Sequence, residues 1–313
     1  MNVLVTGGAG FIGGNLCRRL AAAGHVVTAL DDLSTGTADN LAGTDVKLVE
    51  GTILDPSALD AAISGAGAVV HLAARPSVPR SISDPVASHV VNATGTVEVL
   101  EAARRAGNVH AIVASSSSVY GANPSLPKRE DLATRPVSPY AASKLATEAY
   151  ALAYQSSFGL PVLVFRFFNV FGPLQPAGHA YAAVVPAFLD AALDGKPLVV
   201  HGDGRQTRDF TSVDSVVDVI ALALERRVTF PEPVNLAFGT RTDLLTLVGL
   251  IEEVVGEPVT VQFEDLRPGD VRDSQADSTR LHELFPGVTP VPLPDALRAT
   301  VDWFRSHRAD APR

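Results

Sequence analysis

The chain has 313 residues, which suits one large α/β domain or a domain with an added lobe, and its 46% hydrophobic content is enough for a sizeable core. A formal net charge of −9 without any basic run argues against nucleic acid and anionic membranes as partners. Cys17 is the only cysteine, which excludes an internal disulfide and a cysteine-based metal cluster, so we expect no metal.

Patterns of strand and helix alternate from the first residues onward. Apolar runs typical of buried strands lie at residues 2–6, 25–30, 46–49, 68–72, 109–114 and 161–168. Helical segments at residues 11–23, 85–106 and 138–157 fall between them. This order predicts an α/β fold with a doubly wound parallel Rossmann sheet. Proline and glycine become frequent after residue 171, where we expect a smaller C-terminal substrate lobe.

The N-terminal end shows no targeting signal. It has no basic segment before an apolar stretch, and no apolar run reaches about 18 residues. We therefore expect a cytoplasmic protein.

A glycine-rich turn follows the first strand. Gly7, Gly10 and Gly13 allow the backbone to approach a pyrophosphate, and the helix that follows offers its N–H groups. The second strand ends at Asp31, where a carboxylate can bind a ribose 2′-hydroxyl and repel a 2′-phosphate. The pattern predicts NAD rather than NADP, with Asp32 as a residue that can share this role.

Tyr140 and Lys144 stand four residues apart on a predicted helix, and so share one face. A tyrosine beside an ammonium and a positive nicotinamide is favoured as phenolate, which makes it a base for a carbinol proton. A run of serines at residues 115–118 ends the fifth strand, at the sheet edge where ligands bind.

Several motifs together resemble the extended short-chain dehydrogenase/reductases, and among them relatives of UDP-glucose and UDP-glucuronate 4-epimerases. They are TGGAGFIG, SSSSVYG, YAASK, RFFNVFGP and QTRDF. The resemblance extends from residue 1 to about residue 303. It implies that Ser116 is the catalytic hydroxyl, Tyr140 the base, and Lys144 its partner and a ligand of the nicotinamide ribose.

The resemblance also implies two sets of binding residues. Around NAD they are Gly7, Gly10, Phe11, Ile12, Gly13, Asp31, Asp32, Thr52, Ile53, Leu72, Ala73, Ala74, Asn92, Tyr140 and Lys144. Around a UDP-sugar they are Arg80, Ser117, Ser118, Asn169, Val184, His201, Arg208, Arg267, Asp270 and Ser274. Residues 1–170 would then form the NAD-binding domain, to which 212–240 return. Residues 171–211 and 241–313 would form the UDP-sugar-binding lobe.

Three positions depart from the family pattern. Thr52 stands where an aspartate often binds the adenine amine, and His201 stands where an aromatic residue usually stacks on uracil. The third departure, Ser215 in place of a frequent aspartate, has no consequence that we can assign.

The expected reaction is inversion at C4 through a 4-keto sugar. The C4 hydride passes to NAD and then returns to the opposite face of the sugar. A 4,6-dehydratase is a weaker alternative, because such relatives carry Asp-Glu at the positions of Ser117 and Ser118. A third hypothesis is an inactive NAD-binding regulatory protein, against which the Ser116, Tyr140 and Lys144 set argues.

The sugar and the oligomeric state are further hypotheses. We rank UDP-glucuronate slightly ahead of UDP-N-acetylglucosamine and UDP-glucose, because Ser117 and Ser118 could donate to a carboxylate and Arg80 could balance its charge. Ser274 leaves room for a larger sugar at a position where relatives restricted to glucose and galactose carry tyrosine. The family resemblance also suggests a homodimer formed through the helices at 85–106 and 138–157.

Overall fold

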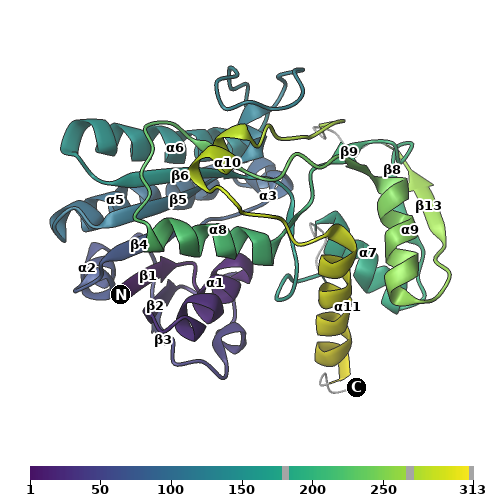
Figure 1. Cartoon of the computed structure of the whole chain (residues 1–313), viewed down its shortest axis with the longest axis horizontal. Coiled ribbons are helices and arrows are strands. Elements are labelled where there is room, and N and C mark those ends of the chain that lie inside the picture. Colours follow the sequence, from purple (N-terminus) through teal and green to yellow (C-terminus); the bar gives the residue numbers. More distant parts are fainter. Residues whose placement is uncertain (178–182, 266–270, 310–313) are drawn as a thin grey trace.

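The computed structural model describes residues 1–177, 183–265 and 271–309. Its centre is a parallel sheet of seven strands in the order β11-β6-β5-β4-β1-β2-β3 (Figure 1). The strands are β1 (Asn2–Thr6), β2 (Val26–Asp31), β3 (Lys47–Glu50), β4 (Ala68–His71), β5 (His110–Ser116), β6 (Val162–Phe167) and β11 (Val234–Leu236). The strand order reverses between β1 and β4, and ligands of such sheets bind at this point, beyond the carboxyl ends of the strands.

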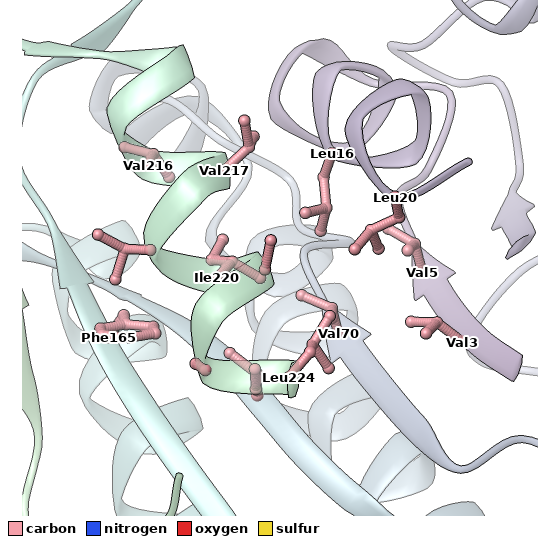
Figure 2. Packing of buried hydrophobic residues seen from close by; sticks show 14 of the residues in the cluster. Val3, Val5, Leu16, Leu20, Val70, Phe165, Val216, Val217, Ile220 and Leu224 are labelled. Atoms are coloured by element: carbon pink, nitrogen blue, oxygen red, sulfur yellow. The ribbon is translucent and has the colours of Figure 1, made fainter. Parts of the chain in front are cut away.

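Helices cover both faces of this sheet. On one face α1 (Phe11–Ala22) and α8 (Val213–Glu225) pack side by side, and Figure 2 shows Leu16 and Leu20 meeting Ile220 above Val5 and Val70. On the other face lie α2 (Pro56–Ile63), α5 (Gly95–Arg105) and α6 (Pro139–Phe158). Because both faces are covered, strands such as β4 are buried along their whole length, which explains their unbroken apolar sequences.

Local signals set the ends of the helix that carries Tyr140. Ser138 caps α6, its Oγ accepting the N–H of Ala141 at 3.1 Å, and Pro139 occupies the first helical position. The helix ends at Gly159, which has a left-handed φ of 67°.

The predicted helix at 85–106 proves to be composite. It consists of α4 (Pro85–His89), a π-helical turn η2 (Val90–Thr94) and α5, and it is preceded by an unpredicted helix, α3 (Val78–Ser83). The six predicted strands agree with β1 to β6 to within two residues. The doubly wound parallel fold is confirmed.

A second core lies beside the sheet, at the right of Figure 1. Its elements are α7 (Val184–Leu193), β8 (Leu198–His201), α9 (Leu244–Val255), β13 (Val261–Glu264) and α11 (Leu293–Ala309). Between them, α8 and β11 return to the main sheet. Helix α10 (Thr279–Leu284) packs against the main sheet and not against the second core. Leu281 on this helix and Phe285, which follows it, belong to the core formed by α1 and α8.

Short strands connect the two cores. They are β7 (Val170–Phe171) with β10 (Thr211–Ser212), and β9 (Thr207–Arg208) with β12 (Thr242–Asp243). The 3-10 turns are η1 (Ala38–Leu41) and η3 (Ser117–Tyr120). Within the described residues, no helix is long and apolar enough to cross a membrane.

Candidate active site

The glycine-rich turn lies where β1 meets α1. A Cβ on Gly13 would lie 2.0 Å from the carbonyl oxygen of Gly7, and one on Gly7 would lie 2.7 Å from the nitrogen of Ala73. Gly7 also has a left-handed φ of 71°. Gly10 begins α1 without a capping side chain, so the N–H groups of the first helical turn have no intrahelical partner. These donors and the helix dipole fit the diphosphate of a dinucleotide.

This turn forms one wall of a cavity of about 770 Å³. The other lining residues include Asp31, Asp32, Thr52, Ile53, Leu72, Ala73, Ala74, Arg80, Ser116, Tyr140, Lys144 and Asn169. The structure therefore brings together all the predicted cofactor residues except Asn92. It also places Arg80 and Asn169, predicted as substrate residues, in the same cavity.

Asp31 and Asp32 have different surroundings. Asp31 is buried, and its two carboxylate oxygens accept the N–H groups of Ala9 and Leu33, each at 2.9 Å. Burial raises the pKa of Asp31, while these backbone donors lower it. Asp32 is exposed and accepts the N–H of Ser34 at 3.0 Å. Asp31 thus ties the glycine turn to the end of β2, and both carboxylates line the cavity.

Ser116, Tyr140 and Lys144 converge on this cavity. Ser116 ends β5, and its Oγ accepts the N–H of Ser118 at 3.2 Å. Lys144 is buried on α6, and its Nζ donates to the carbonyl oxygen of Ala114 at 2.8 Å. The side chains of Tyr140 and Ser116 share a hydrogen bond.

Burial shifts the pKa values of Tyr140 and Lys144 in opposite directions. Burial raises the pKa of Tyr140, although the hydrogen bond from Ser116 opposes this shift. Burial lowers the pKa of Lys144 to about 8. The expectation that Lys144 and a positive nicotinamide together favour the phenolate concerns the enzyme with NAD bound, and it stays a prediction.

The serines at the end of β5 have separate environments. Ser115 is buried, and its Oγ donates to Glu148 Oε2 at 3.0 Å. Glu148 forms a buried ion pair with Arg166, whose guanidinium lies 4.7 Å from the ring centre of Tyr120. This network joins β5, α6 and β6, and no sequence pattern indicated it.

Ser117 and Ser118 do not line the cavity, contrary to their predicted contact with the sugar. Both lie in η3, and the Ser118 hydroxyl is buried without a hydrogen-bond partner in the described part of the chain.

Asn92 also differs from its prediction, because it lies behind the cavity wall. Its Oδ1 accepts the N–H of Arg75 at 2.7 Å, and its Nδ2 donates to Ser143 Oγ at 2.9 Å. Asn92 therefore connects the loop that lines the cavity to helix α6. Its location inside the helical segment gave no indication of this bracing role.

His71, which the sequence did not single out, lies at the base of the same region. Its Nδ1 lies 2.8 Å from Thr6 Oγ1 and its Nε2 lies 3.1 Å from Thr96 Oγ1. Burial, with a smaller effect from the charge of Lys144, lowers the pKa of His71 to about 3.

A second cavity, of about 260 Å³, begins on the other side of Asn169. Its lining includes Val184, His201, Gln206, Arg208 and Phe210. Arg208 is anchored there, because its Nη1 donates to the carbonyl oxygen of Arg272 at 3.0 Å. The sequence missed Gln206, whose Oε1 is buried and unpaired within the described residues.

The three remaining predicted substrate residues follow β13 in the sequence. Arg267 and Asp270 lie outside the described residues. Ser274 lines neither cavity, and its N–H donates to the carbonyl oxygen of Thr207 at 3.0 Å.

Residues 3–237 match the model of the NAD dependent epimerase/dehydratase family. The chain belongs to this family. Among curated members, the UDP-glucose 4-epimerase of Mycolicibacterium smegmatis is 40% identical, with 98% of this chain and 99% of that protein covered. A dTDP-glucose 4,6-dehydratase of Streptomyces griseus is 36% identical over 98% of this chain and 95% of the relative.

Solved structures of the epimerase/dehydratase family are equally similar. A UDP-N-acetylglucosamine 4-epimerase from Methanobrevibacter ruminantium, in complex with UDP-N-acetylmuramic acid, superimposes with a TM-score of 0.93 at 35% identity, covering 98% of each chain. A UDP-glucuronic acid 4-epimerase from Bacillus cereus, in complex with UDP-glucuronic acid and NAD, gives a TM-score of 0.90 at 30% identity, covering 98% of this chain and all of that one. The expected family, the NAD cofactor and the epimerase class are confirmed.

Proposed function

We propose that this enzyme is a UDP-sugar 4-epimerase that inverts C4 through a transient 4-keto sugar. The proposal is carried by one arrangement: Ser116, Tyr140 and Lys144 line the same cavity as the glycine turn, and Asn169 joins that cavity to a second one containing Arg208. A dinucleotide in the first cavity and a nucleoside diphosphate in the second would direct the sugar toward Tyr140.

Tyr140 is the proposed base for the proton of the sugar 4-hydroxyl. The Ser116 hydroxyl, already bonded to Tyr140, would hold that sugar oxygen. Because burial raises the tyrosine pKa, the phenolate needs positive charge close by. Lys144 carries one such charge, and its hydrogen bond to Ala114 leaves two ammonium N–H groups for other partners. Bound NAD supplies the acceptor, and later the donor, of the C4 hydride.

The second cavity is the proposed site of the UDP portion. Arg208 and Asn169 would bind the diphosphate, His201 would stack on uracil, and Val184 would contact the nucleoside. Arg267 and Asp270 remain proposed ligands outside the described residues. Anchoring the substrate by UDP leaves the sugar free to turn between hydride loss and hydride return.

UDP-glucose is the first candidate for the sugar substrate. The 40% identity to a UDP-glucose 4-epimerase over nearly the full length supports it, and Ser117 and Ser118 do not line the cavity in which we expected them to bind a carboxylate. UDP-glucuronate is the second candidate, because Arg80 lines the cavity and has no ion-pair partner among the described residues. A carboxylate on C6 would supply one.

The two rival functions have weaker support. A dehydratase needs an acid and a base to remove the C6 hydroxyl, and Ser117 and Ser118 cannot supply that pair near neutral pH. An inactive NAD-binding protein has no need for Ser116, Tyr140 and Lys144 in one cavity.

The deciding experiment is to incubate the purified enzyme with UDP-glucose, UDP-glucuronate and UDP-N-acetylglucosamine and to identify the products by NMR. We expect the C4 epimer to form without dehydration. Tyr140→Phe should lose at least about a thousandfold in kcat and still bind NAD and UDP. A 4-keto-6-deoxy product would indicate a dehydratase, whereas binding without turnover of any sugar would favour the regulatory alternative.

We also propose a homodimer formed through α3, α4 and α6. These helices expose large apolar side chains, namely Ile82 (62% exposed), Val86 (71%), Tyr150 (47%) and Phe158 (49%). Large exposed apolar side chains on neighbouring helices are typical of a surface buried by association. Light scattering should give twice the chain mass, and Tyr150→Glu should reduce it. A monomeric wild-type protein at micromolar concentration would contradict the proposal.

A further inference from the structure

A third cavity, of about 390 Å³, shares no lining residue with the other two. Its walls come from the loop that follows η3 and from the segment that precedes Ser274. The lining residues are Gly121, Ala122, Asn123, Pro124, Leu126, Lys128, Val137, Val271, Arg272 and Asp273. None of them belongs to the site proposed for NAD and UDP.

Lys128 is the distinctive residue of this cavity. Its side chain is buried, with 4% of the residue exposed, and its Nζ donates to the carbonyl oxygen of Asn123. An ammonium has three N–H donors, and Lys128 has no other partner among the residues that the structure describes. Burial lowers the pKa of Lys128, and no carboxylate offsets this effect. A buried cation with one neutral partner is costly, and an anion in the cavity would remove that cost.

The other charged residues of the cavity are already paired. Asp273 accepts the Thr207 hydroxyl at 2.6 Å and lies 3.3 Å from Arg241. Arg272 pairs with Asp203 at 3.0 Å. The cavity therefore offers one unneutralised charge, that of Lys128, which matches a monoanion better than a phosphate dianion.

Apolar side chains complete the walls. Leu126, Val137 and Val271 all line the cavity and are 36%, 53% and 37% exposed. A ligand with a carbon skeleton attached to its anionic group would cover them. We propose that this cavity binds a carboxylate, with Lys128 as the residue that recognises it.

Two sources of this carboxylate are chemically equivalent at Lys128. One is an acidic substituent on the sugar of the substrate, which rests on the proposed epimerase function and would place that substituent at Lys128 instead of Arg80. The other is a free small organic acid. One wall is linked to the proposed UDP site, because Arg208 donates to the carbonyl oxygen of Arg272 at 3.0 Å.

The test uses the full-length enzyme and three variants. Lys128→Met removes the charge at similar length, Lys128→Arg keeps it, and Lys47→Met removes an exposed lysine from β3 as a matched control. A neutral side chain of similar length at a buried lysine is expected to preserve folding. Circular dichroism would establish this before any assay.

In the first arm, kcat/KM is measured for UDP-glucuronate and UDP-glucose. If the substrate supplies the carboxylate, Lys128→Met lowers the preference for UDP-glucuronate at least tenfold, while Lys128→Arg and Lys47→Met retain it. In the second arm, calorimetry measures the binding of free glucuronate. If the ligand is a free acid, the wild type binds it and Lys128→Met binds it at least tenfold more weakly.

The proposal is overturned if Lys128→Met leaves both the sugar preference and the binding of free glucuronate unchanged. Failure of the epimerase proposal is separately visible, because wild-type enzyme would then turn over neither sugar. The calorimetric arm would still report on the cavity in that case.

Discussion

Protonation of His71 is expected to destabilise the fold in acid. The ring is 2% exposed, both nitrogens are hydrogen-bonded to hydroxyls, and its pKa is lowered from 6.5 to about 3. A histidine buried in the neutral form stabilises the fold above the unfolded pKa, and this stability is lost as the pH falls from 6.5 toward 3. At about pH 4.5 the difference is 6.5 − 4.5, or 2 units, and at about 1.36 kcal/mol per unit the loss is about 2.7 kcal/mol.

The assay is urea unfolding of wild type and His71→Asn at about pH 7.5 and about pH 4.5. Asparagine keeps a polar group near Thr6 but cannot take up a proton. We expect the variant to have the lower free energy of unfolding at the higher pH. The difference in this free energy between the two proteins should narrow by about 2.7 kcal/mol at the lower pH. Comparing the two proteins cancels the titration of the acidic residues they share. If the difference in the free energy of unfolding does not change with pH, the histidine is not buried as a neutral ring. NMR of its side-chain nitrogens would give its charge directly.

Three further substitutions probe the ligand sites. Asp31→Ala should weaken NAD binding and relax discrimination against NADP, since it removes a repulsive carboxylate and the hydrogen bond that holds Ala9 of the glycine turn. Unchanged affinities for both cofactors would locate the ribose contact elsewhere. Arg208→Ala should raise the KM for the UDP-sugar about tenfold or more, and unaltered inhibition by UDP would show that the diphosphate binds at another place. Gly13→Ala should abolish measurable NAD binding in calorimetry, because its Cβ would lie 2.0 Å from the Gly7 carbonyl oxygen; near-normal affinity would mean that the turn can yield.

Local sequence was sufficient for the main sheet and for the convergent residues. All the predicted strands except β3 are largely buried, and burial on both faces leaves an apolar run that can be recognised without tertiary information. Tyr140 and Lys144 could be predicted for a similar reason, since the period of one helix brings them together.

What the sequence did not reveal depends on contacts between distant segments. Glu148 and Arg166 have the sequence pattern of ordinary surface charges, and only the packing of α6 against β5 and β6 buries them together. The four serines cannot be distinguished from the sequence alone. In the structure, Ser115 donates to Glu148 while Ser117 and Ser118 lie in a 3-10 turn. Lys128 was likewise indistinguishable from an exposed lysine until the segment near Ala276 was found beside it.

Asn169 has a consequence for how the two ligands affect each other. It lines both the larger cavity and the second one, its φ is 34°, and its Nδ2 donates to the carbonyl oxygen of Asp209 at 3.3 Å. A residue in this left-handed conformation is held by its surroundings and has few alternative positions. If NAD shifts this shared wall and so changes the affinity for UDP by some factor, thermodynamic linkage requires UDP to change the affinity for NAD by the same factor. Replacing one side chain, Asn169, would then alter that factor in both directions at once.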